Sequence, residues 1–185
     1  MRHLSPVIKK ASDSFLSLLL WLFVAPVAML VHNKSRSVVV MGRQRGLFVD
    51  NAKYFFMFGA ESDKYAENVV FLTANHELCA DILKLGSRAV IYPSFKGAWT
   101  LLRAQVVVYD SVEWIRNGRL QLSFRARKVQ LWHGAPLKQI ELPLYQGKLS
   151  RMRPVNRVMS ELYNWVTARY VGSDLLISTS CYFAE

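Results

Sequence analysis

Cysteine is scarce in this chain, and this scarcity excludes several kinds of site. The 185 residues contain two cysteines, Cys79 and Cys181, with no CxxC pair and no cluster of cysteine with histidine. A disulfide framework and a zinc centre are therefore not expected, and we predict neither a metal nor a cofactor. Sparse, unpaired cysteine is typical of a protein that faces the cytoplasm.

Acidic residues are also few. There are 13 Asp and Glu against 24 Lys and Arg, which gives a formal net charge of +11. This excess suits a protein that meets anionic lipid or a polyanionic substrate, although an ordinary solvated surface explains it equally well. Nucleic acid is not an expected partner, because the basic residues are scattered and the sequence contains no nucleic-acid-binding module.

Long apolar runs are absent except for one near the beginning of the chain. Between Phe15 and Val31 only Ser17 is polar, which is short for a membrane-spanning helix, and no small-residue cleavage site follows. We predict that residues 1–34 form a membrane-attachment segment, which either spans the bilayer or lies in its interface. The alternative is a helix buried against the domain. Basic residues flank the run on both sides: Arg2, Lys9, Lys10, Lys34, Arg36, Arg43 and Arg45.

After residue 34, short apolar strands alternate with helical stretches, without repeats or low-complexity tracts. The strands are continuously apolar, which is typical of strands covered on both faces. Alternation with helices indicates right-handed crossovers and a parallel sheet. We therefore predict that residues 35–185 form a Rossmann-like, doubly wound α/β domain. Strands are expected at 37–42, 68–73, 88–92, 105–109, 128–132 and 175–178, and helices at 52–60, from Asn75 to 85, after Ser94 and near 155–170.

Three loops at the carboxyl ends of these strands carry the chemically useful residues. Ligands of open parallel sheets bind at that edge. The loops are 42–51, 110–111 and 129–138. In the first, Asp50 and Asn51 directly precede a predicted helix, so capping that helix is the alternative to a binding role.

The third loop is the most informative, because an apolar strand ends directly before His133. Histidine titrates near neutral pH and can accept a proton from an attacking hydroxyl. Gly134 permits close approach of a ligand, and Pro136 suits the first turn of a helix. The free N–H groups of that turn, together with Lys138, would attract an anion. We therefore predict that His133 is a catalytic base.

Residues 130–138, QLWHGAPLK, resemble the QxWHGTPLK signature of the CDP-glycerol glycerophosphotransferases, which build teichoic-acid-type polymers. Ala135 replaces the usual threonine, which removes a hydroxyl group. Residues 48–54, FVDNAKY, are similar to the F-x-DNSKY segment of the same family, and residues 92–97 and 102–104 are similar to its S-x-KG and LLRA pieces.

The resemblance implies a GT-B architecture of two Rossmann-like domains with the active site between them. Members transfer glycerol phosphate, or a related polyol phosphate, from a CDP-activated donor to a membrane-bound polyol-phosphate or lipid-linked acceptor. The resemblance makes His133 the base for the acceptor hydroxyl, and it assigns substrate binding to Asp50, Asn51, Lys53, Gly134 and Lys138. It also implies work in cell-envelope polymer synthesis at the cytoplasmic face of the cell membrane.

In this family the CDP-binding residues lie in the second domain. We therefore expect the chain to be the acceptor-side half, either as a fragment or paired with a separate donor-binding chain. Two alternatives remain open. One is a GT-B glycosyltransferase of capsule or lipopolysaccharide synthesis, and the other is a non-catalytic membrane-bound module that binds a polyanion.

Overall fold

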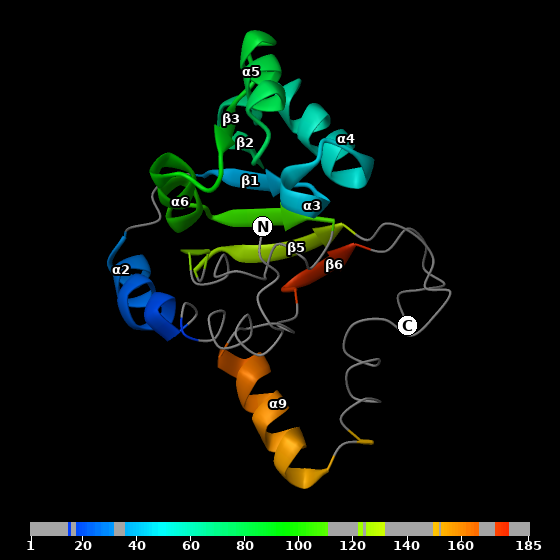
Figure 1. Cartoon of the computed structure of the whole chain (residues 1–185). Coiled ribbons are helices and arrows are strands. Elements are labelled where there is room, and N and C mark those ends of the chain that lie inside the picture. The colour runs from blue at the N-terminus through cyan, green and yellow to red at the C-terminus, as the bar shows by residue number, and fades with distance from the viewer. Residues whose placement is uncertain are drawn as a thin grey trace.

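A six-stranded sheet forms the centre of the computed structural model (Figure 1). The structure describes residues 15, 18–31, 36–110, 122–123, 125–131, 150–151, 153–166 and 173–177. All neighbouring strands are parallel, and their order is β3-β2-β1-β4-β5-β6. This is the strand order of a Rossmann-like fold, and it confirms the predicted parallel α/β sheet. The strands are β1 (Val38–Met41), β2 (Val69–Thr73), β3 (Ala89–Ile91), β4 (Val106–Tyr109), β5 (Arg127–Leu131) and β6 (Leu175–Ile177).

The central strands are apolar throughout because both faces of the sheet are buried. Successive side chains of a strand point to opposite faces. In β1, Val39 and Met41 belong to one core cluster, whereas Val40 belongs to the other. The first cluster includes Leu101, and the second includes Phe56. Burial on two sides explains why the sequence shows no alternation of apolar and polar residues in these strands.

Three helices between the strands supply this cover. They are α4 (Asp50–Ala60), α5 (His76–Lys84) and α6 (Phe95–Leu102). The helix starts expected at Asn75 and after Ser94 are confirmed, and both residues cap their helices. The side chain of Asn75 accepts from the N–H groups of residues 77 and 78, and that of Ser94 accepts from the N–H of Gly97. Gly86, with a φ of 76°, follows the end of α5. A short 3₁₀ helix, η2 (Ala66–Asn68), leads into β2.

The first predicted loop is more ordered than expected. It contains a short helix, α3 (Arg43–Gly46), where only a loop was expected. In addition, α4 begins at Asp50 rather than at residue 52, so Asp50 and Asn51 lie in its first turn. The residue at the N-cap position is Val49, which makes no side-chain capping bond. Asp50 therefore does not occupy the capping position that the sequence suggested for it.

The apolar segment near the beginning of the chain packs on the domain through one side only. It forms a π-helical stretch, η1 (Leu20–Val24), and then α2 (Ala25–Leu30). Ala28 is buried, Val24 packs against the first core cluster, and Arg125 donates to the carbonyl oxygens of Met29 (3.0 Å) and Val31 (3.2 Å). Among the described residues, no helix has the length and apolar character to cross a membrane. Apolar side chains remain exposed here: Phe15, Leu18, Leu22, Phe23, Val27, Met29 and Leu30.

The helix α9 (Pro154–Val166) precedes β6 and extends away from the sheet (Figure 1). It occupies most of the helix predicted near residues 155–170. Four of its apolar residues recur at helical spacing and are exposed: Val155, Val158, Met159 and Leu162.

Candidate active site at the carboxyl edge of the sheet

The three loops singled out in the sequence leave three adjacent strands. β1 pairs with β4, and β4 pairs with β5. The strand order reverses direction between β1 and β4, and doubly wound sheets bind ligands at the carboxyl edge of this switch point. Met41 pairs with Tyr109, and Tyr109 pairs with Gln130, so the loops after these strands begin side by side.

The loop after β1 is held close to the sheet by two glycines. A Cβ on Gly42 would lie 1.8 Å from the carbonyl oxygen of Leu47. Gly46 has a φ of 89°, and a Cβ there would lie 2.4 Å from the carbonyl oxygen of Leu72. Any larger side chain would force the loop away from the strand ends, so both positions require glycine.

Thr73, the last residue of β2, fastens the same loop from the neighbouring strand. Its hydroxyl donates to the carbonyl oxygen of Gly46 (2.8 Å) and accepts from the N–H of Asn75 (3.1 Å). The side chain is buried. Thr73 was not among the predicted site residues, although a single polar residue at the end of an otherwise apolar strand was a signal that could have identified it.

Asp50 closes the loop through an ion pair with Arg43, whose Nη2 lies 2.9 Å from Oδ2 of Asp50. The two side chains are 41% and 39% exposed, so solvent and ligands reach both groups. Asp50 also has a φ of 54°, a left-handed conformation that aspartate tolerates better than most residues. In addition, Nε of Arg43 is buried without a hydrogen-bond partner among the described residues. The site therefore presents a cationic group beside a strained backbone position.

Asn51 and Lys53 lie on the first turns of α4 and are half-buried. The ammonium group of Lys53 is 5.7 Å from the ring centroids of both Phe48 and Tyr54. Cation–π contacts of this kind favour a fixed position for the ammonium group. Of the residues assigned to substrate binding, the structure therefore brings Asp50, Asn51 and Lys53 together at the start of one helix.

The second loop begins at Asp110, which directly follows β4 and is buried. A chain of hydrogen bonds connects the ends of β4 and β5. The hydroxyl of Tyr109 is 2.8 Å from Oγ of Ser173, which donates to Oε1 of Gln130 (2.9 Å). Gln130 is the first residue of the QLWHGAPLK segment and is itself buried. This network ties β4 and β5 to the residues that precede β6, a link that the sequence did not reveal.

His133, Gly134 and Lys138 lie outside the described residues, as does Ser111. β5 ends at Leu131, two positions before His133 in the sequence. The roles assigned to these residues remain predictions.

Two further features of the described part concern a possible cysteine nucleophile and possible metal ligands. Burial raises the pKa of the Cys79 thiol, with a smaller opposing effect from Lys96, so this cysteine is a poor nucleophile at neutral pH. Within the described ranges, no three His, Cys, Asp or Glu side chains are grouped so that they could hold a metal ion.

A doubly wound sheet with basic and acidic groups at its switch point defines an α/β ligand-binding domain. The model of the CDP-glycerol:poly(glycerophosphate) glycerophosphotransferase family matches residues 24–183, and the chain belongs to this family. No curated protein and no solved structure matches the chain.

Proposed function

We propose that the chain provides the acceptor side of an enzyme that transfers glycerol phosphate, or a related polyol phosphate, from a CDP-activated donor. The acceptor is a membrane-bound polyol-phosphate or lipid-linked molecule of cell-envelope polymer synthesis. Family membership supports a glycerophosphotransferase. The observation that carries the proposal further is the strand order, which sets the carboxyl ends of β1, β4 and β5 side by side at the switch point.

The proposed chemistry needs one base and several cationic groups. The acceptor hydroxyl attacks the phosphorus that bears the glycerol, and its proton passes to His133. A bond from the attacking oxygen to phosphorus forms, the bond between that phosphorus and the bridging oxygen breaks, and CMP leaves. Arg43 and Lys138 would balance the negative charge of the phosphate groups near the strand ends. Gly134 would allow a substrate to approach the backbone closely. The acceptor would be positioned by Asp50, Asn51 and Lys53.

Transfer from CDP-[¹⁴C]glycerol to a lipid-linked glycerol phosphate acceptor tests this proposal. In a preparation that also supplies the donor-binding domain, we expect incorporation of label that depends on both substrates. UDP-glucose in place of CDP-glycerol serves as the control, since a sugar nucleotide is the donor expected of the alternative glycosyltransferase. Transfer of glucose without transfer of glycerol phosphate would overturn the proposal.

We also propose that the donor nucleotide is held mainly by a second Rossmann-like domain, as in a GT-B enzyme. The support is the resemblance of the chain to the acceptor-side half of such enzymes. We expect residues 1–185 alone to bind CDP-glycerol only in the millimolar range, measured by isothermal titration calorimetry. Micromolar affinity would contradict this part of the proposal, because it would require a nucleotide site within these residues.

The proposed location is the cytoplasmic face of the cell membrane. The exposed apolar residues of η1 and α2 support it, because a helix docked by one side and apolar on the other suits a bilayer interface. The exposed apolar stripe of α9 adds to this support, and Arg151, Arg153 and Arg157 at its beginning would favour anionic headgroups.

Co-sedimentation with vesicles tests the proposed attachment. The chain should bind vesicles that contain anionic lipid, and a Leu22→Glu, Phe23→Glu double variant should bind markedly less. The matched control is Leu83→Glu, Leu85→Glu, which changes two exposed residues at the end of α5. Equal loss in both double variants would contradict attachment through η1 and α2. Release by salt would favour interfacial binding over spanning, since surface charges are screened within about 8 Å at physiological salt.

A further inference from the structure

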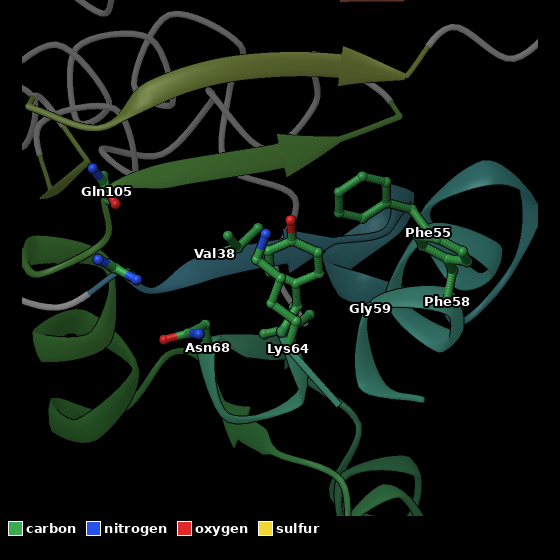
Figure 2. A pocket seen from close by; sticks show the side chains of 10 residues that line it. Val38, Phe55, Phe58, Gly59, Lys64, Asn68 and Gln105 are labelled. Carbon is green, nitrogen blue, oxygen red and sulfur yellow. The ribbon is translucent and has the colours of Figure 1, made fainter. Parts of the chain in front are cut away.

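A pocket of about 500 Å³ opens at the amino-terminal edge of the sheet, opposite the candidate active site (Figure 2). Its wall includes Val38 and Val69, the first residues of β1 and β2. Its volume lies within the range of about 300–1,000 Å³ that is typical of small-molecule sites. Because this pocket lies at the other edge of the sheet, its occupant is not the reacting end of the transfer acceptor.

The pocket is apolar at one end and polar at the other. Figure 2 shows Phe55 and Phe58 of α4 at one end, and Asn68 and Gln105 at the opposite end. Arg36 also lines the pocket. It belongs to the polar end, because its neighbour in the sequence, Ser37, accepts a hydrogen bond at its carbonyl oxygen from the N–H of Gln105 (3.0 Å). A ligand with an apolar tail and a polar head would match this arrangement.

The charged groups of the lining are cationic. Arg36 and Lys64 are both exposed, and neither forms an ion pair within the described part of the chain. The ammonium group of Lys64 lies 5.2 Å from the ring centroid of Tyr65, which also lines the pocket. Among the described residues, no acidic side chain is part of the lining. The polar head of the ligand is therefore expected to be an anion.

The end of α2 lies at the same edge of the sheet as the pocket. Arg125, just before β5, holds that end at the amino-terminal edge. The two features lie on opposite faces, because Val24 packs against the first core cluster and Phe55 against the second. Only four residues separate Val31 from Arg36 in the sequence. A lipid is the ligand class that combines an apolar tail with an anionic head, and it matches the aromatic and cationic lining of the pocket.

We propose that this pocket binds the acyl chain of an anionic lipid. The chain would lie against Phe55 and Phe58, and the phosphate or carboxylate head would lie at Arg36 and Lys64. Binding requires no covalent step. Burial of the acyl chain against the aromatic rings would supply the apolar contribution to the binding free energy.

The test uses the full chain and soluble ligands with ten-carbon chains, each kept below its critical micelle concentration, in isothermal titration calorimetry. Decanoyl lysophosphatidic acid and decanoate should each bind saturably at one site, and comparison of the two distinguishes phosphate from carboxylate heads. Uncharged monodecanoylglycerol should bind at least ten-fold more weakly. Inorganic phosphate alone should neither bind nor compete. Saturable binding of inorganic phosphate with the same affinity as the lipid would overturn the proposal.

Variants then locate the ligand. Gln105→Trp should block the polar end without disturbing the backbone hydrogen bonds of residue 105. Lys64→Glu should reverse a charge at an exposed position. Each variant should weaken binding at least ten-fold. Lys84→Glu is the matched control at an exposed lysine of α5, and it should leave affinity unchanged. Equal affinity in Lys64→Glu and Lys84→Glu would contradict the proposal, and this comparison remains valid if Gln105→Trp does not fold. Loss of binding in the Leu22→Glu, Phe23→Glu variant alone would place the lipid on α2 and overturn it.

Discussion

At the scale of single residues, Asp50 combines an ion pair with a left-handed backbone, and substitutions separate the two. Asp50→Asn should leave the free energy of unfolding within about 1 kcal/mol of the wild type, because asparagine tolerates this conformation and a half-exposed ion pair contributes little. Asp50→Val should lose about 1–2 kcal/mol or more, because a β-branched residue is strained at positive φ. Urea unfolding of the two variants measures the difference.

The same variants test whether Asp50 belongs to the site. If it positions the acceptor, Asp50→Asn should lower transfer activity while its stability remains near that of the wild type. Asp81→Asn is the control, since Asp81 forms a comparable surface pair with Lys84 (3.0 Å) on α5. Full activity in Asp50→Asn would restrict Asp50 to a structural role.

Lys128 gives a pH-dependent prediction at this scale. Burial lowers the pKa of its ammonium group from the ordinary value of 10.5, and the nearby Asp174 opposes part of this effect. The folded state therefore holds this proton less tightly than the unfolded state. Through Lys128, the free energy of unfolding should rise as pH increases from the lowered pKa toward 10.5, and this gain should be lost as pH falls.

Lys128→Met removes this titration. The melting temperature of the wild type, measured by circular dichroism relative to that of the variant, should therefore increase as pH rises toward 10.5. A difference that is constant with pH would show that the environment of Lys128 does not change on folding.

At the scale of structural elements, Thr73 connects β2 to the loop after β1. Thr73→Val keeps the shape of the side chain but leaves the carbonyl of Gly46 without its buried donor. We expect a loss of about 1–3 kcal/mol in the free energy of unfolding. Thr100→Val is the control, because its hydroxyl bonds to the carbonyl of Lys96 at an exposed position and should change stability by less than about 0.5 kcal/mol. Similar losses in both would mean that Thr73 does not fasten the loop.

The elements also show how much the sequence could predict. Continuous apolar runs gave the strands to within a residue or two, and Asn75 and Ser94 marked helix starts correctly, because burial and capping are local effects. The short helix α3 was missed because contacts with other parts of the chain, such as the approach of Gly46 to Leu72, fix that loop. The pairing of Arg43 with Asp50 depends on the fold of the same loop, so residue spacing alone did not reveal it.

At the scale of the whole molecule, the two edges of the sheet carry different features. The carboxyl edge holds the loops of the candidate site, whereas the amino-terminal edge holds the end of α2 and the pocket near Arg36. Strands of this length hold the edges roughly 15 Å apart, at about 3.3 Å per residue. The prediction for His133 depended on the family signature and on the position of this residue after β5 in the sequence. The order of the strands in the sheet could not be read from the sequence.

We propose that His133 removes the proton from the acceptor hydroxyl, and a comparison of turnover with thermal stability tests this role. In a preparation with demonstrated transfer from CDP-glycerol, turnover and melting temperature are measured for the wild type and for His133→Ala. We expect turnover to fall by about 10²–10⁴-fold while the melting temperature is nearly unchanged, because proton removal is needed only as the hydroxyl attacks. A folded His133→Ala variant with near-wild-type turnover would exclude His133 as the base.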